Sequence, residues 1–212
     1  MSWFTQVLVT AIASFVATNI DDIVILMIFF AQVNSTFRTK HIVAGQYLGF
    51  TLLILASLPG FFGALILPKA WIGLLGIVPI AIGMHQLLQR EEEEDEPVPT
   101  LTVNPDAIKP SVIASLLAPQ TYQVAAVTFA NGGDNIGIYV PLFASTNWAS
   151  LGLTLSVFFL LLGAWCAIAY FLTRRPLIAD TLTRYGERIV PFVLMGLGIF
   201  ILIENGTYSL LP

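Results

Sequence analysis

The sequence predicts an all-α integral membrane protein, and its composition is the first observation that does so. Hydrophobic residues make up 57% of the 212 residues and charged residues only 10%, whereas soluble domains carry about 25% charged residues. The mean hydropathy is +0.84. The apolar residues are also gathered in long runs, and polar motifs interrupt two of these runs at matching places. We therefore expect a helical bundle that spans a lipid bilayer.

A window of about 19 residues identifies six segments that are apolar enough to cross a bilayer. They cover residues 4–33, 42–67, 70–89, 119–145, 149–173 and 188–205. The first and fourth segments are longer than the roughly 20 residues that a straight span needs. Polar residues interrupt these same two segments, and the pair Gly132-Gly133 allows the fourth to unwind. We therefore expect transmembrane helices 1 and 4 to be broken or kinked.

A polar segment over residues 90–118 separates two halves, residues 1–89 and 119–212. It begins with the acidic run 91–96 and contains four prolines. Such a segment has too little apolar surface to fold by itself, so we expect a flexible linker. The net charge of −4 comes largely from this run, and it gives no indication of nucleic-acid binding.

The two halves resemble each other at a fixed spacing. Asn19 and Asp22 match Asn131 and Asp134 at an offset of 112 residues, and an Ile-Val-Pro triplet at 77–79 recurs at the same offset. A unit of three crossings enters the membrane in the opposite direction in its second copy. The sequence therefore predicts two inverted three-helix repeats, a plan in which transporters bind their substrate between the repeats near the middle of the membrane.

Basic residues gather on one side of the predicted membrane. If all six segments span it, eight of the nine Lys and Arg residues lie in or beside the loops after the first, third and fifth segments, and Lys69 lies opposite. An excess of basic residues marks the cytoplasmic side. We expect residues 90–118 to be cytoplasmic and both termini to be outside. The eight residues are Arg38, Lys40, Arg90, Lys109, Arg174, Arg175, Arg184 and Arg188.

Two acidic residues, Asp22 and Asp134, lie inside long apolar runs, and each follows an asparagine by three residues. An ionisable side chain inside a membrane is costly, by roughly 2.5–3.5 kcal/mol on insertion scales, and marks a functional site by default. Residues i and i+3 share one face of a helix. Asn19 and Asn131 can therefore present amide oxygens beside the two carboxylates.

Four further side chains are candidates for the same site: Thr18, Asn135, Asp21 and Gln46. Adjacent residues point about 100° apart on a helix, so Asp21 either shares the site through local unwinding or faces a separate water-filled path. Gln46 lies in a Gly-x-x-x-Gly motif, which more often marks close helix packing than a site. It is nevertheless a candidate for lining the pathway.

Carboxylates and amide oxygens together form a hard, anionic site that suits a divalent cation. Binding of the metal would displace protons from the carboxyl groups, which gives a basis for metal–proton exchange. The single cysteine, Cys166, excludes an internal disulfide and a cage of thiolate ligands. We expect no cofactor, because the cation is the substrate.

The motifs Thr-Asn-Ile-Asp-Asp at 18–22 and Asn-Gly-Gly-Asp-Asn-Ile at 131–136, the latter followed by Gly-Ile-Tyr-Val-Pro at 137–141, together with the layout of three plus three helices, resemble the bacterial cadmium resistance transporter family. That family belongs to the lysine exporter superfamily. The likeness extends from the first to the sixth predicted helix. The resemblance implies export of a divalent heavy metal across the bacterial plasma membrane, with the acids and amides of the two motifs as the matching positions.

Two other functions stay open at this point. An intramembrane aspartyl protease also uses two acids on different helices, although Asn131-Gly132-Gly133 replaces the Gly-x-Gly that such proteases carry before the second acid. An exporter of basic amino acids would need a cation for the substrate carboxylate. No Lys or Arg lies in the middle of a predicted span, although a helix N-terminus can substitute.

The sequence also bears on how transport is driven and on whether the protein forms a dimer. The chain has no Gly-x-x-x-x-Gly-Lys-Ser/Thr motif for ATP, so we expect a secondary active transporter rather than an enzyme. Glycine-rich stretches at 60–63 and 73–76 allow close helix packing, either within one protomer or across a homodimer.

Overall fold

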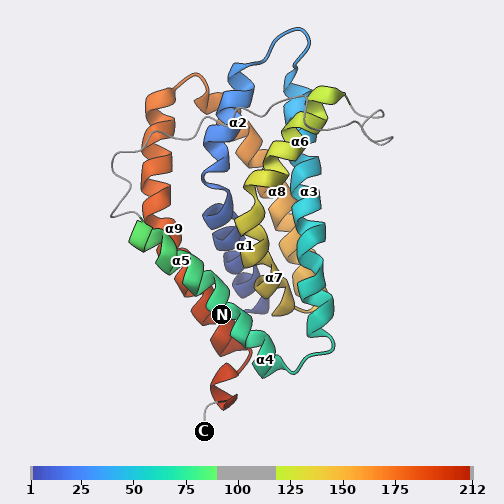
Figure 1. Ribbon diagram of the computed structural model, residues 1–212, viewed down its shortest axis with the longest axis vertical. Helices are drawn as coiled ribbons and strands as arrows, with labels where there is room; N and C mark the ends of the chain where they lie inside the picture. Colours follow the sequence, from blue (N-terminus) through green and yellow to red (C-terminus); the bar gives the residue numbers. More distant parts are fainter. Residues whose placement is uncertain (1, 90–117, 211–212) are drawn as a thin grey trace.

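All the secondary structure in the described part of the chain is helical, which confirms the all-α prediction there (Figure 1). The computed structural model describes residues 2–89 and 118–210, apart from the side chains of residues 89, 134, 176–184, 186–187, 208 and 210. The predicted linker with its acidic run therefore lies outside the described residues. The helices are α1 (Trp3–Asn19), α2 (Asp22–Ala31), α3 (Thr39–Ala64), α4 (Lys69–Gly73), η1 (Leu74–Gly76), α5 (Ile77–Gln89), α6 (Pro119–Asn131), α7 (Gly133–Ala144), α8 (Trp148–Leu172), α9 (Pro176–Glu204) and η3 (Thr207–Leu210).

Among the described residues, three helices are long and apolar enough to cross a membrane by themselves. They are Thr39–Ala64, Lys69–Leu88 and Trp148–Leu172, the second of which combines α4, η1 and α5. The pair α1 and α2 makes a fourth candidate span, bent by 59° at the break between the two helices. The prediction that the first span is interrupted is thus confirmed.

The two other predicted spans, 119–145 and 188–205, are not among the candidate spans of the described residues and stay predictions. The helices α6 and α7 have only 13 and 12 residues, and polar residues such as Gln120 and Gln123 lower the hydropathy of α6. The apolar part of α9 lies between Arg188 and Glu204, which is shorter than the roughly 20 residues that a span needs.

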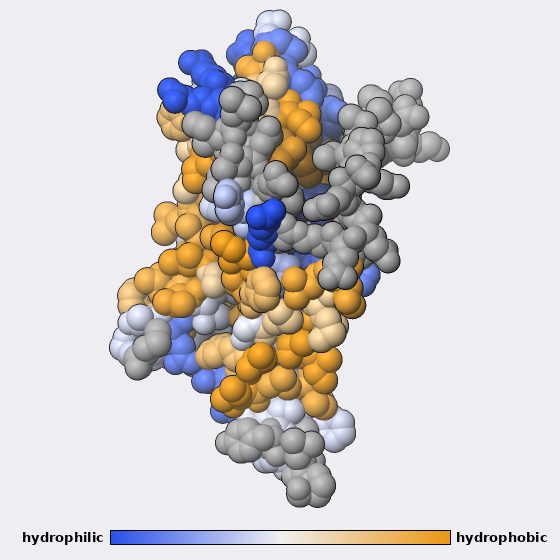
Figure 2. Space-filling model, turned by 90° about the vertical axis from the view of Figure 1, so that its left-hand side faces the viewer, coloured by the Kyte–Doolittle hydropathy of each residue, from blue (hydrophilic) through white to orange (hydrophobic). Residues whose placement is uncertain are grey.

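Apolar side chains cover much of the outer surface, as expected for a bundle that faces lipid. Figure 2 shows them across the middle of the face that it views. Leu160 on α8 and Phe192 on α9 are 74% and 60% exposed. The protein itself does not bury these two side chains, and contact with lipid would remove them from water.

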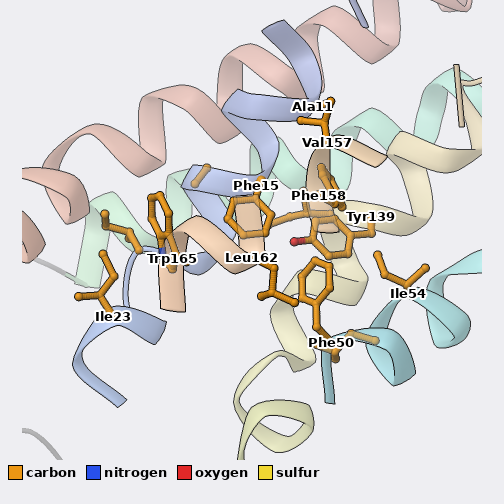
Figure 3. Packing of buried hydrophobic residues seen from close by; sticks show 14 of the residues in the cluster. Ala11, Phe15, Ile23, Phe50, Ile54, Tyr139, Val157, Phe158, Leu162 and Trp165 are labelled. Carbon is orange, nitrogen blue, oxygen red and sulfur yellow. The ribbon is translucent and has the colours of Figure 1, made fainter. Parts of the chain in front are cut away.

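Each broken pair of helices packs against one long continuous helix. α3 lies against α6 and α7, α8 lies against α1 and α2, and α5 lies against α9. A fully buried aromatic cluster joins the group of α3, α6 and α7 to the group of α8, α1 and α2 (Figure 3). The ring centroids of Phe15 and Phe50 are 5.8 Å apart, and those of Tyr139 and Phe158 are 5.0 Å apart. Because these four rings come from α1, α3, α7 and α8, they fix the broken helices relative to the continuous ones.

The break between α1 and α2 contains no glycine or proline, so tertiary contacts must stabilise it. The indole N–H of Trp165 on α8 donates to the carbonyl oxygen of Asn19, at the end of α1, at 2.6 Å. The amide of Val24 then donates to the carbonyl of Asp21 at 3.0 Å, which starts the next turn. A carbonyl at the end of a helix needs a partner in an apolar environment, and Trp165 supplies one here.

The break between α6 and α7 lies at Gly132, as the glycine pair predicts. The amide of Gly132 donates to the carbonyl of Thr128 at 3.0 Å and closes α6. A Cβ atom at this position would collide with the side chain of Leu53 on α3. The φ of Gly132 is −82°, which any residue can adopt, so it is the close approach of Leu53, and not the turn, that favours glycine at position 132.

The Gly-x-x-x-Gly motif of α3 does mark close helix packing. A Cβ atom at Gly45 would lie 2.7 Å from the carbonyl oxygen of Thr121, and one at Gly49 would lie 2.7 Å from that of Ala125. Both contacts are on α6. The absence of side chains at these two positions lets the backbones of α3 and α6 approach each other.

We expect Gly49→Ala to lower the stability of the protein by about 1–3 kcal/mol, because the added methyl group overpacks the contact between α3 and α6. Gly63→Ala is the matched control, since it lies on the same helix and a Cβ atom there meets nothing within 4 Å. Thermal unfolding of both variants in detergent, followed by circular dichroism, checks this. Equal melting temperatures for the two variants would contradict the packing described above.

Candidate functional site

The two helix breaks meet through the polar motifs that the sequence singled out. Asp22 is the first residue of α2 and Asn131 is the last residue of α6. The amide nitrogen Nδ2 of Asn131 donates to Oδ1 of Asp22 at 2.8 Å and lies 3.5 Å from Oδ2 of Asp21. Three of the eight candidate residues are thus in contact with one another.

Gln46 extends this group from α3. Its Nε2 donates to Oδ2 of Asp22 at 3.5 Å, and its Oε1 accepts from the hydroxyl of Thr128 at 2.6 Å. Gln46 and Thr128 are 2% and 3% exposed. Amide groups from α3 and α6 therefore lie beside Asp22. The hydrogen bond from Thr128 on α6 to Gln46 on α3 links these two helices on the side of Gln46 away from Asp22.

The environment of Asp22 compensates in part for its burial. Only 5% of the residue is exposed, and an ionised carboxylate in such a place requires hydrogen-bond donors. Asn131 and Gln46 donate to its two oxygens. Its position in the first turn of α2 also places it at the positive end of the helix dipole. Asp21, by contrast, is exposed.

A second polar cluster lies at the end of α1. The hydroxyls of Thr18 and Tyr139 are 2.7 Å apart, and Nδ2 of Asn19 donates to the hydroxyl of Tyr139 at 3.0 Å. Nδ2 of Asn19 also donates to the carbonyl of Phe15 at 2.8 Å. Thr18 and Asn19 are buried. The first motif is thus held against α7 by Tyr139.

This cluster leaves one buried oxygen available. Because a carbonyl only accepts hydrogen bonds, the contact with Phe15 fixes which side of the Asn19 amide is Nδ2. Its Oδ1 has no hydrogen-bond partner among the described residues. A buried amide oxygen without a donor is unusual in a protein interior, and it is a natural ligand for a cation.

Two candidates from the second motif are placed less completely. Asp134 is the second residue of α7, but its side chain lies outside the described part of the structure, so its place in the site stays a prediction. Asn135 is buried in the first turn of α7.

Sequence reasoning missed Thr128 and Tyr139 as members of these clusters. A signal existed for Thr128, because it precedes Asn131 by three residues and so shares its face of α6. Tyr139 lies in an apolar stretch, and nothing in its spacing distinguishes it from a core residue. Its contact with Thr18 arises only because α7 packs beside α1.

Carboxylate and amide groups make up the site. The side chains of Asp21, Asp22, Gln46 and Asn131 lie in one group of contacts, in which the two amides present their NH₂ groups to the carboxylates. Among the described side chains, no group of three or more His, Cys, Asp or Glu residues is arranged to hold a metal.

A cavity of about 540 Å³ lies farther along the same two helices. It is close to the C-terminal end of α2 and the N-terminal end of α6, opposite to the ends that carry Asp22 and Asn131. Amides and hydroxyls make up much of its wall. The lining residues are Phe29, Gln32, Asn34, Thr36, Phe37, Gln120 and Gln123.

Comparison with known proteins agrees with the motifs. A family model described as cadmium resistance transporter matches residues 15–211. Neither a curated protein nor a solved structure matches the chain. The matched range contains both Asn-x-x-Asp motifs and every helix from the last part of α1 onward. The chain belongs to the cadmium resistance transporter family.

Proposed function

We propose that this protein is a secondary active exporter that binds a divalent metal cation between its two helix breaks and exchanges it for protons. The observation that carries the proposal is the contact between Asp22 and Asn131, which brings a buried carboxylate and the second motif together. The family consists of cadmium resistance transporters. An acidic group at such a depth is expected to serve transport.

The donor set supports a divalent cation as the substrate. Asp22 supplies negative charge, and the unpartnered Oδ1 of Asn19 supplies a neutral oxygen. Gln46 and Asn131 present their NH₂ groups to Asp22, and rotation of either amide would bring its oxygen to a cation there. We propose that Asp134, Asn135, Asp21 and Thr18 complete the site. Oxygen ligands bind manganese, magnesium or calcium as well as cadmium. The family name favours cadmium or a similar ion among them.

The burial of Asp22 supports the proposed exchange with protons. When the metal leaves, an ionised carboxylate remains in apolar surroundings, where charge is disfavoured. Uptake of a proton neutralises it, and the next metal ion displaces that proton. Metal and proton would thus use the same oxygen atoms in turn, which couples their movements in opposite directions.

Helix packing supports the inverted repeat. If the halves are exchanged at the offset of 112 residues, the contact of α3 with α6 and α7 becomes the contact of α8 with α1 and α2, and both occur. Trp165 contacts Asn19 at the first break. Its counterpart at this offset, Leu53, packs on Gly132 at the second break. We propose that the two breaks are related by this two-fold exchange, as in the lysine exporter superfamily.

The cavity and the positions of the chain ends support an orientation of the protein in the membrane. The termini lie in the lower half of Figure 1, and the loop between α2 and α3 lies at the top. On the predicted orientation this loop is cytoplasmic, and the cavity beside it is lined by the ends of α2 and α6 that lie away from Asp22 and Asn131. We propose that it is the cytoplasmic vestibule of a bacterial plasma-membrane protein with both termini outside. The family match gives no support to a protease or to an amino-acid exporter.

The first test is metal flux into proteoliposomes, with cadmium, manganese, zinc and calcium compared. We expect selective uptake of one or more of these ions, with loss of protons from the vesicle interior. An acidic interior should accelerate uptake, and an uncoupler should remove the acceleration. Metal flux that is indifferent to the pH gradient would reject proton exchange and leave metal transport standing.

We expect Asp22→Asn to reduce flux to the level of empty vesicles, because the substitution removes the charge and keeps the shape of the side chain. Asp21→Asn is the matched control on the neighbouring, exposed residue, and it should weaken flux less. Size-exclusion chromatography of both variants checks that they remain folded. A folded and fully active Asp22→Asn variant would rule out the proposed site.

Asp134→Asn should abolish flux as Asp22→Asn does, because the second motif matches the first at the same offset. The measurement is the same flux assay on the purified variant. Native flux in this variant would mean that only the first repeat binds the cation.

A further inference from the structure

We infer that Thr128 is a positioning residue whose hydroxyl pairs with the far end of the Gln46 amide, so that either end of this amide can face Asp22. Thr128 does not itself contact Asp22 in the described hydrogen bonds, and it acts through Gln46. This inference rests on the proposed function, since it assumes that a cation binds at Asp22. It adds a residue that neither motif of the sequence contains.

The geometry is that of a short relay inside the bundle. The hydroxyl of Thr128 donates to Oε1 of Gln46 at 2.6 Å, and Nε2 of Gln46 donates to Oδ2 of Asp22 at 3.5 Å. All three residues are at least 95% buried. Water is therefore poorly placed to substitute for a missing partner, and each polar atom depends on its neighbour in the relay.

The direction of the relay is set by Asp22. Both oxygens of Asp22 accept hydrogen bonds in this arrangement, from Nε2 of Gln46 and Nδ2 of Asn131, so the NH₂ end of the Gln46 amide faces the carboxyl group. The oxygen end of Gln46 then faces Thr128 and requires a donor. A threonine hydroxyl can supply one, because it both donates and accepts.

A cation at Asp22 reverses this requirement. Amide hydrogens repel a cation, whereas the amide oxygen is a good ligand for one. Rotation of the Gln46 amide by half a turn brings Oε1 to the cation and Nε2 to Thr128. The hydroxyl of Thr128 then accepts a hydrogen bond from Nε2. Thr128 thus gives Gln46 a partner in both orientations, and no backbone movement is required.

The packing around Thr128 holds the hydroxyl in place for both tasks. A Cβ atom at Gly49 on α3 would lie 2.7 Å from Cβ of Thr128, so α3 presses closely on this residue. Threonine on a helix has two main rotamers. In the observed one the hydroxyl lies beside Gln46, one turn along α3 from Gly49.

The experiment measures KM and maximal rate of cadmium uptake into proteoliposomes for the native chain and for matched variants. Thr128→Val keeps the shape and removes the hydroxyl, and it should raise KM roughly tenfold, as expected when a buried polar atom has lost its partner. Thr128→Ser keeps the hydroxyl and should retain a KM near that of the native chain. Thr121→Val is the control, because Thr121 is equally buried two turns away on α6 and should have the native KM.

A double-mutant cycle separates positioning from general packing. If Thr128 acts only through Gln46, adding Thr128→Val to Gln46→Leu should not raise KM further. A residue with a merely structural role would raise KM by the same factor in both backgrounds. This comparison requires measurable flux from Gln46→Leu, and the Thr128→Ser variant tests the role of the hydroxyl independently of it.

The outcomes distinguish this inference from the proposed function. Absence of metal flux in the native chain overturns the proposed function and this inference with it. Native flux with an unchanged KM in Thr128→Val overturns the inference alone. An elevated KM in Thr128→Ser, or equal effects of Thr128→Val in both backgrounds, also overturns it, because packing rather than the hydroxyl would then be responsible.

Discussion

Keeping the carboxylate of Asp22 inside an apolar bundle is the constraint on which the rest of the structure depends. An ionised group there requires donors from several directions, and a single straight helix does not supply them. The chain meets this need by breaking the helix directly before Asp22 and by bringing Asn131 and Gln46 to its oxygens. The break in turn frees backbone groups, which is why Trp165 is bonded to the carbonyl of Asn19.

The site is less symmetric than the packing of the helices. Gln46 on α3 has Phe158 as its counterpart on α8 at the offset of 112 residues. Phe158 belongs to the buried aromatic cluster, whereas Gln46 contacts Asp22. One long helix therefore brings polar groups to the breaks, and the other brings aromatic rings. Under the proposed two-fold exchange, both halves keep the packing while only one keeps this polar contact, because packing depends on volume and binding depends on particular atoms.

Close helix packing and the polar site are parts of the same contact. Gly45 and Gly49 bring α3 close to α6, and Gln46 lies between them in the sequence. The two interpretations of this stretch, close packing or a pathway residue, are therefore compatible. The missing side chains at the glycines let α3 approach near enough for Gln46 to contact both Thr128 and Asp22.

The sequence by itself determined the helical class, the approximate ranges of α3 and α8 and the break at Gly132, and it made Asp22, Asn131 and Gln46 candidates for one site. These depend on composition, apolar run length and local spacing, which are properties of the chain. The sequence placed the start of the last helix at residue 188, whereas α9 begins at Pro176. Only the tertiary structure decided that Tyr139 binds Thr18, that Trp165 stabilises the first break and that Thr128 supports Gln46. Those contacts join helices distant in the sequence, and Tyr139 and Trp165 look like core residues until their neighbours are known. The reason is physical: a polar group in an apolar interior needs a hydrogen-bond partner, and which residue supplies it depends on how the helices pack.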